Sequence, residues 1–266
     1  MPHGESWFSL ALRGTPIWEN LENFVRFLNR SITGEEDTWY ANMPVEVGHV
    51  VGALFVLLVL AIFAVISYNG VKDTQAAVVP EGRFSIRTFV ELFTGTALSM
   101  MSDIMGPKAA RYFLPLIGTC AFFILFSNFM GLIPGLTPPT DTLSTTIALA
   151  LIIFVATHIY GLKENGFGHI KHLFGPIIKW YALPLMLLMF CIEVISHLAR
   201  PLSLSLRLMA NMFADHLVLG VFLGLVPFLV PVPIMLLGTL VVVVQTLVFC
   251  ILSTVYIGLA IQHEEH

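Results

Sequence analysis

Long apolar runs, each near or above the length needed to cross a lipid bilayer, dominate the pattern of hydrophobic and polar positions. A hydrocarbon layer about 30 Å thick is crossed by about 20 helical residues. Five runs meet this length, at residues 47–68, 112–133, 142–161, 181–225 and 229–261. The pattern predicts an all-α membrane protein in which these runs form transmembrane or membrane-embedded helices.

One further segment, residues 84–105, has a different pattern. Its apolar residues recur at helical spacing, but Arg87, Glu91 and Asp103 interrupt them. Such a mixture is typical of an amphipathic helix that lies on the membrane surface. A solvated helix in a loop domain is the alternative. We expect the surface position, because the chain offers no other soluble domain for this helix to pack on.

The last two runs are too long for simple upright spans. As one helix, residues 181–225 would extend about 65 Å, roughly twice the hydrocarbon thickness. The segment must therefore tilt steeply, break or lie along the membrane, and Pro201 offers a bend near its middle. The simplest arrangement is a hairpin of two long, strongly tilted helices, 181–225 and 229–261.

Composition supports the membrane interpretation and excludes several function classes. Of the 266 residues, 57% are hydrophobic and only 11% are charged, and the net charge is −4. No basic patch suited to nucleic acid is present. The three cysteines all fall within apolar runs and lack the close spacing of a zinc or redox site.

The distribution of Lys and Arg predicts the orientation in the membrane. Residues 70–111 carry five basic residues and 162–180 carry three, whereas 134–141 and 226–231 carry none. Basic loops stay on the cytoplasmic side. Residues 1–46 hold three basic against seven acidic residues, so we expect an extracytoplasmic N-terminal segment, a single membrane domain over 47–266 and a cytoplasmic C-terminus.

Polar and ionisable residues gather in the fourth apolar run. They are Glu193, His197, Arg200, Arg207, Asn211, Asp215 and His216. Positions 193, 200 and 207 are seven residues apart and share one side of a helix. Because an ionisable residue costs about 2.5–3.5 kcal/mol at the centre of a membrane helix, each is a functional hypothesis.

Two readings of this polar stripe stay open. Glu193 could pair with Arg200 or His197, and Arg207 with Asp215, only to hold the helices together. Alternatively, Arg207 performs a task that needs a permanent cation, because a guanidinium stays charged whatever the local pH. A fixed cation facing a carboxylate that takes up and releases an ion would favour the ionised form and repel passing cations. It would act as a gate between two half-pathways.

Other polar residues within the apolar runs are candidates for lining an aqueous path. They are Asn128, Asp141, His158, Gln245, Ser253 and Tyr256. Gln245 could bond a facing arginine, line a water wire or simply hold two helices together. Asp141 could equally be the N-cap of the helix that follows it.

No motif for covalent, nucleotide or metal chemistry is present. The terminal HEEH differs from the HExxH of metalloproteases, because no third ligand or helical context follows it. No P-loop, GxGxxG or nucleophile elbow occurs. We therefore expect no cofactor, no bound metal and no catalytic activity of the chain on its own.

The segment PLSLSLRLMANMFADH resembles the signature of subunit a of the rotary F-type ATP synthase, the membrane stator. Further support comes from SNFMGLIPG at 127–135, from Glu193 fourteen residues before Arg207, and from QTLVFCILSTVYIGLA at 245–260. The similarity covers about residues 85–265. The arginine motif together with the late glutamine is specific to this family.

The resemblance implies a protein that presents two long tilted helices to a rotating ring of c subunits in the inner membrane. Arg207 would be the stator charge facing the ring carboxylate. Asn211 and Gln245 match the polar residues that accompany it, and Glu193 matches an acid of the cytoplasmic half-channel. The implied partners are the c-ring, subunit b of the peripheral stalk and the lipid bilayer, and the subunit would bind no nucleotide.

The chain departs from many bacterial relatives at two places. Asp215 and His216 stand where Gly-Glu is common, and Gly238 stands where a histidine is often found, seven residues before Gln245. The acid and the imidazole thus stand at neighbouring positions rather than at the usual ones. Asp215 and His216 could together supply a proton relay in the outer half-channel, because histidine changes its charge near neutral pH.

Two other function classes stay open on the sequence. A self-contained transporter or channel would use Glu193, Arg207 and Asp215 as a substrate site and would work alone. A purely structural scaffold would need Arg207 for assembly but not for ion flow. If the chain is a stator, the choice of proton or sodium lies mainly in the partner ring.

Overall fold

The computed structural model describes residues 11–12, 14–33, 48–71, 85–133, 135–165, 183–225 and 231–261. These parts are helical and contain no strand. The α-helices are α2 (Pro16–Thr33), α3 (Gly48–Val71), α4 (Ile86–Met105), α5 (Pro107–Gly131), α6 (Leu143–Asn165), α8 (Leu183–Leu225) and α9 (Pro231–Ile261), with a short 3-10 helix, η1, at Pro139–Asp141. The all-α fold is confirmed.

Five of the described helices are long and apolar enough to cross a membrane. These are α3, α5, α6, α8 and α9, and each corresponds to one of the five predicted apolar runs. Their bounds differ from the predicted runs by a few residues only. The orientation in the membrane stays a prediction, because much of the sequence on which it depends lies outside the described residues. These parts are residues 72–84, 166–182 and 226–230 and the terminal HEEH.

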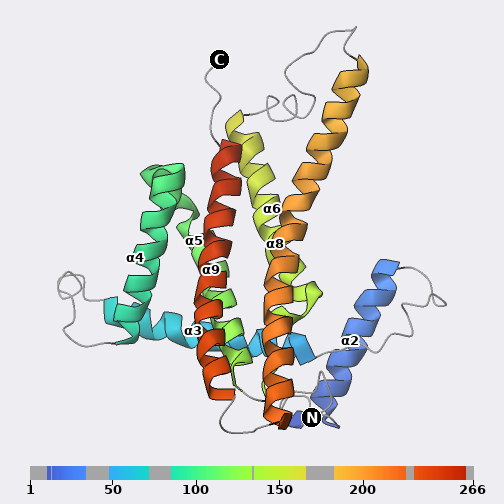
Figure 1. Cartoon of the computed structure of the whole chain (residues 1–266), viewed down its shortest axis with the longest axis vertical. Helices are drawn as coiled ribbons and strands as arrows, with labels where there is room; N and C mark the ends of the chain where they lie inside the picture. Colours follow the sequence, from blue (N-terminus) through green and yellow to red (C-terminus); the bar gives the residue numbers. More distant parts are fainter. Residues whose placement is uncertain are drawn as a thin grey trace.

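The helix α3 runs across the direction of α8 and α9 (Figure 1). Its candidate span, Gly48–Tyr68, has 21 residues, about 31 Å, which matches the hydrocarbon thickness. Only 11% of this span is buried within the chain, as expected for a helix surrounded by lipid. If α3 stands along the membrane normal, α8 and α9 make a large angle with that normal. They then form the strongly tilted hairpin that their lengths require.

The helix α8 passes through Pro201 without ending. Proline removes one backbone hydrogen bond from the ladder and here leaves the carbonyl of His197 without its usual N–H donor. A break at Pro201 was one way to fit this segment into the membrane. The helix does not break there, and its 43 residues form a single helix about 65 Å long.

The core of the molecule forms around α5. This helix contacts α4 on one side and α9 on another, while α6 packs against both α8 and α9. Ile117, Ala121 and Ile124, on one side of α5, are fully buried. Close packing at these positions holds the long helices in a fixed relation, because a lipid environment supplies no hydrophobic force between them.

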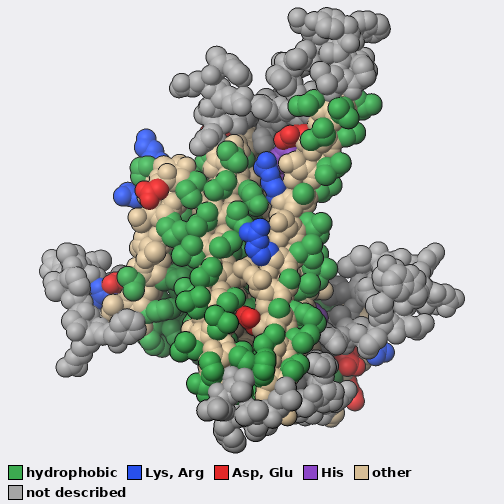
Figure 2. Space-filling view, viewed as in Figure 1, with side chains coloured by type: hydrophobic (Ala, Val, Ile, Leu, Met, Phe, Trp, Pro, Cys, Tyr) green, Lys and Arg blue, Asp and Glu red, His purple; other side chains and the backbone are tan. Residues whose placement is uncertain are grey.

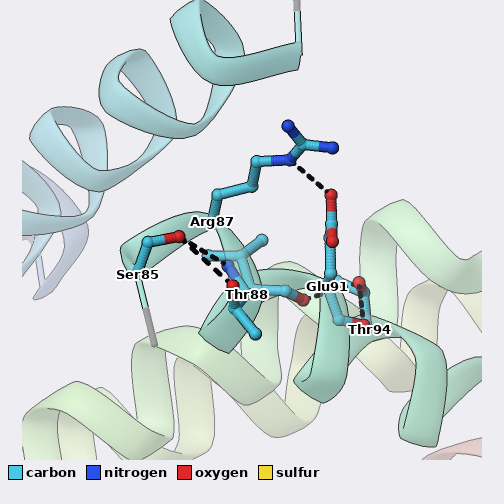
Figure 3. Close-up of polar contacts among 6 residues, drawn as sticks. Ser85, Arg87, Thr88, Glu91 and Thr94 are labelled. Atoms are coloured by element: carbon cyan, nitrogen blue, oxygen red, sulfur yellow. Dashed lines mark hydrogen bonds and ion pairs between the residues drawn. The ribbon is translucent and has the colours of Figure 1, made fainter. Parts of the chain in front are cut away.

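The start of α4 is held by local polar contacts (Figure 3). Ser85 caps the helix by accepting a hydrogen bond from the Thr88 backbone N–H at 3.3 Å. Arg87 is buried and donates from Nε to Glu91 Oε1 at 2.7 Å, while the Glu91 side chain stays half exposed. These contacts satisfy the polar groups of a helix that packs along α5.

The opposite side of α4 supplies apolar contacts to the core. Phe93 packs against Phe122 of α5, with ring centroids 4.3 Å apart. The helix is therefore amphipathic, as the sequence predicts. Its position on the membrane surface stays a prediction.

A close approach of three segments occurs at Gly131, the last residue of α5. A methyl group there would lie 2.8 Å from Pro138 Cγ and 3.1 Å from Met212 Cε of α8. We therefore expect Gly131→Ala to destabilise the isolated chain in detergent by about 1–3 kcal/mol, the usual cost of overpacking. The measurement is thermal unfolding followed by helical circular dichroism.

Gly220→Ala is the matched control for that experiment. Gly220 lies in α8 with no atom within 4 Å of the added methyl group. Since alanine favours a helix over glycine by about 1 kcal/mol, this variant should unfold at the same temperature or higher. Equal unfolding temperatures for the two alanine variants would show that the contact at Gly131 is not tight.

Candidate functional site

The polar stripe of α8 lies along its border with α9. Figure 2 shows basic side chains on this border with hydrophobic side chains on both sides. The side of α8 that faces the bundle is apolar and buried at Leu204, Leu208 and Met212. The polar residues therefore lie at the edge of the packed interior, where a partner outside the chain can reach them.

Arg207 is the exposed charge of this stripe. Its neighbours Leu206 and Phe213 are also exposed, at 40% and 56%, so the outer surface around it is apolar. Within the described part of the chain Arg207 forms no hydrogen bond or ion pair, and Asp215 is not its partner. The ion pairing considered as an alternative for Arg207 is therefore absent from these residues.

One turn away, Asn211 and Gln245 join α8 to α9. Asn211 Nδ2 donates to Gln245 Oε1 at 2.7 Å, and Gln245 is 5% exposed. Gln245 therefore forms a hydrogen bond between two helices, which is one of the roles considered for it. Its partner is Asn211 and not Arg207. The bond fixes the rotation of both helices beside Arg207.

A second polar group lies nearer the start of α8 and includes Glu193. His197 Nε2 is 3.3 Å from Glu193 Oε1, and the rings of His197 and His158 are 5.2 Å apart in an edge-on arrangement. Of the two partners considered for Glu193, the structure brings it to His197. His158, predicted only as a lining residue, is thereby connected to Glu193 across α6 and α8.

Arg200 belongs to the same region but contacts a different helix. Its guanidinium lies 5.7 Å from the centre of the Tyr256 ring on α9, in cation–π geometry. A small pocket is lined by His158, His197, Arg200 and Tyr256 together with Thr157 and apolar residues. Three helices thus contribute polar side chains to one location.

Asp215 and His216 lie on the other side of Arg207, toward the end of α8. Both are half-buried. The Oδ2 atom of Asp215 is inaccessible and has no hydrogen-bond partner among the described residues. A buried carboxylate oxygen without a protein partner is costly, so this is a place where water or a transferred proton would be stabilised.

The remaining predicted residues fall into different surroundings. Asn128 is fully buried and accepts a hydrogen bond at Oδ1 from Thr140 at 2.7 Å. Ser253 is fully buried, and its hydroxyl has no hydrogen-bond partner within the described helices. Asp141 ends η1, and α6 begins at Leu143, so Thr142 occupies the position directly before that helix. Asp141 is thus two residues before the first residue of α6, and the N-cap role considered for it stays open.

Sequence reasoning missed a polar contact between α6 and α8. The hydroxyls of Thr146 and Ser205 are 3.1 Å apart and buried. Ser205 lies in the PLSLSLRL motif, but nothing in the motif distinguishes it from Ser203. Thr140, the partner of Asn128, was also missed, because a threonine in a Pro-rich turn carries no signal of a distant contact.

At Gly238 the structure has little space for a side chain. A Cβ atom there would lie 2.7 Å from Leu132 Cδ2. Leu132 therefore fills the region into which a residue at position 238 would project. No group of three or more His, Cys, Asp or Glu side chains suited to a metal occurs in the described ranges.

Comparison with known proteins shows a consistent similarity. Residues 52–258 match the family described as ATP synthase A chain. The chain is 43% identical to ATP synthase subunit a of Sorangium cellulosum (strain So ce56) over 100% of both sequences. It is 47% identical to ATP synthase subunit a of Geobacter sulfurreducens over 75% of this chain and 82% of the relative. With ATP synthase subunit a 2 of Syntrophotalea carbinolica it shares 49% identity over 71% and 76% of the two chains.

The contact between Asn211 and Gln245 predicts energetic coupling between α8 and α9. We expect Asn211→Ala and Gln245→Ala together to destabilise the chain by less than the sum of the single changes. The expected coupling is about 0.6 kcal/mol and at most about 1.7 kcal/mol, the range found for hydrogen bonds between membrane helices. The measurement is a double-mutant cycle of unfolding free energies in mixed micelles.

A second cycle serves as its control. It combines Asn211→Ala with Thr239→Ala, since the Thr239 hydroxyl bonds only within α9, to the carbonyl of Met235 at 2.9 Å. The two changes of this control should add. Additivity in both cycles would show that the amide contact contributes nothing to the helix pair.

Proposed function

The chain belongs to the ATP synthase A chain family, and we propose that it translocates protons or sodium ions as the stator subunit facing the c-ring of an F-type ATP synthase. As a member of this family it is a multi-pass membrane component of the synthase complex. The finer proposal concerns how its residues handle the ion. It rests mainly on one observation, the exposed cation of Arg207, which has no ion pair among the described residues and lies in an apolar surface.

An exposed arginine on a membrane helix needs a stabilising group, and the described helices do not supply one to Arg207. Left in hydrocarbon, a charged side chain at mid-depth costs several kcal/mol. Asn211 and Gln245 bond to each other, and neither bonds to the guanidinium among the described residues. A carboxylate on a neighbouring rotating subunit is the complementary group. As the c-ring turns, each of its subunits would bring its carboxylate to Arg207 in turn.

The two polar groups on either side of Arg207 fit two half-channels. Asp215 and His216 would form the outer one, where ions enter and protonate a ring carboxylate. Glu193, with His197 and His158 beside it, would form the cytoplasmic one, where the carboxylate releases its ion. Asn128, Asp141, Ser253 and Tyr256 are proposed as further lining residues.

Arg207 would prevent ions from passing directly between these half-channels. Each loaded carboxylate must then travel around the ring through lipid, so that ion flow is coupled to rotation. One charge moving through 100 mV releases about 2.3 kcal/mol. In this scheme the subunit performs no covalent chemistry, and ATP synthesis takes place elsewhere in the complex.

The remaining parts of the proposal concern assembly and location. We place the chain in the inner membrane with the N-terminus outside and the C-terminus in the cytoplasm, in contact with subunit b as well as the c-ring. A rival transporter function would need a substrate pocket that includes Arg207, and the pocket lined by His158, His197, Arg200 and Tyr256 does not include it. A scaffold role is tested by the first experiment below.

Neutralising Arg207 tests the gate. In vesicles that contain the assembled synthase, Arg207→Ala should abolish ATP synthesis while passive proton leak is kept or increased, because the barrier between the half-channels is removed. ATP formation after an imposed proton gradient and dye-reported proton flux are the two measurements. Subunit content is checked by gel.

Arg200→Ala is the matched control, because Arg200 is the other arginine of α8 and contacts Tyr256. It should assemble and retain measurable synthesis. Continued synthesis by an intact Arg207→Ala complex would make the gate proposal wrong, and loss of assembly in that variant alone would favour a scaffold role.

Asp215→Asn tests the outer half-channel. The amide cannot accept and release a proton, so proton flux should fall by about a hundredfold or more, the contribution typical of a positioned proton-transfer group. Asp103→Asn, at an exposed acid of α4 away from the polar stripe, should leave flux unchanged. Equal flux through both variants would exclude Asp215 from the path.

A further inference from the structure

The helix α2, which plays no part in the proposed ion path, has two chemically distinct faces. Ile17, Leu21 and Phe24 recur at helical spacing, and positions 25, 28 and 32 continue the apolar series as Val, Leu and Ile. We call this series the α2 apolar stripe. The opposite face carries charged and amide residues, so the helix is strongly amphipathic.

On the polar side of α2, three residues contact one another within the helix. Trp18 Nε1 donates to Glu22 Oε1 at 2.9 Å, and Arg26 lies 3.9 Å from the same carboxylate group. Glu19 and Glu22 balance Arg26 and Arg30, so the helix has no formal net charge. It therefore has little attraction for a strongly charged partner, and any binding must come from the apolar stripe.

Two large side chains of that stripe, Ile17 and Phe24, are exposed, and Leu21 between them is half-buried. Ile17 is 65% exposed and Phe24 is 58% exposed, and α2 makes no extensive packing with another described helix. Large apolar side chains that recur along one whole face differ from the scattered single residues of an ordinary surface. The stripe is suited to an apolar environment outside the chain.

The position of α2 identifies that environment. Fourteen residues separate Thr33 from Gly48, the first residue of the span α3, and they can reach at most about 50 Å. Figure 1 shows α2 near the beginning of α3, on the opposite side from α4, and running obliquely to α3. A helix that begins near the first turn of a span and follows a different direction is well placed to lie along the membrane surface.

We propose that α2 is an interfacial helix, whose apolar stripe inserts into the leaflet at which α3 begins. Amphipathic helices of this kind bury their apolar face at the boundary of headgroups and acyl chains. Trp18, at the border between the two faces, is the residue type enriched at that depth. The inference goes beyond ion translocation and does not depend on Arg207.

Two opposite positions of α2 allow a direct test. Leu21 belongs to the stripe and Asn23 to the polar face, about 160° apart on a helix. In a background with Cys120, Cys191 and Cys250 replaced by Ala, Leu21→Cys and Asn23→Cys are each labelled with a nitroxide. The full synthase complex is then reconstituted in vesicles of phosphatidylcholine and phosphatidylglycerol, so that every natural partner is present.

The measurement is the collision rate of each nitroxide with oxygen, which concentrates in lipid, and with a water-soluble nickel chelate. We expect the oxygen-to-nickel ratio to be several-fold higher at position 21 than at position 23. High nickel access at both positions would place the helix in water and overturn the proposal. Low access of both reagents at position 21 would show that another protein covers the stripe, which also overturns it.

Discussion

The hydrocarbon layer of a bilayer is about half as thick as α8 is long, and the arrangement of the other helices follows from this mismatch. A helix of 43 residues remains within a slab of about 30 Å only by lying far from the normal. Its partner α9 must follow it, and α5 and α6 must support the pair from one side. The span α3, whose length fits the layer, is the one that crosses the others in direction.

A strongly tilted helix has a property that an upright one lacks: it presents a long sequence of residues at nearly the same depth. Polar groups can then be separated along the membrane plane as well as across it. In α8 the pair Glu193 and His197, the cation Arg207 and the carboxylate Asp215 follow one another along the helix axis, so a strong tilt would separate them in this way. A partner moving past the helix would meet them one after another.

The sequence predicted the helices well because each depends on a long-range average of hydrophobicity. The predicted segment 181–225 and the observed Leu183–Leu225 differ by two residues at one end. The polar contacts between helices were harder to foresee. Asn211 with Gln245, or His158 with His197, depends on the rotation and axial shift of two helices, and a change of one residue in either would separate the groups.

The close contact between Gly238 and Leu132 has a consequence for how this protein can diverge. The Cβ atom of any side chain at position 238 would lie 2.7 Å from Leu132 Cδ2. The atom in the way is the terminal methyl group of a flexible, half-buried side chain. A change of the Leu132 rotamer, or a smaller residue at position 132, would therefore make space for a side chain at position 238. The occupant of position 238 is thus coupled through one side chain to the loop that follows α5.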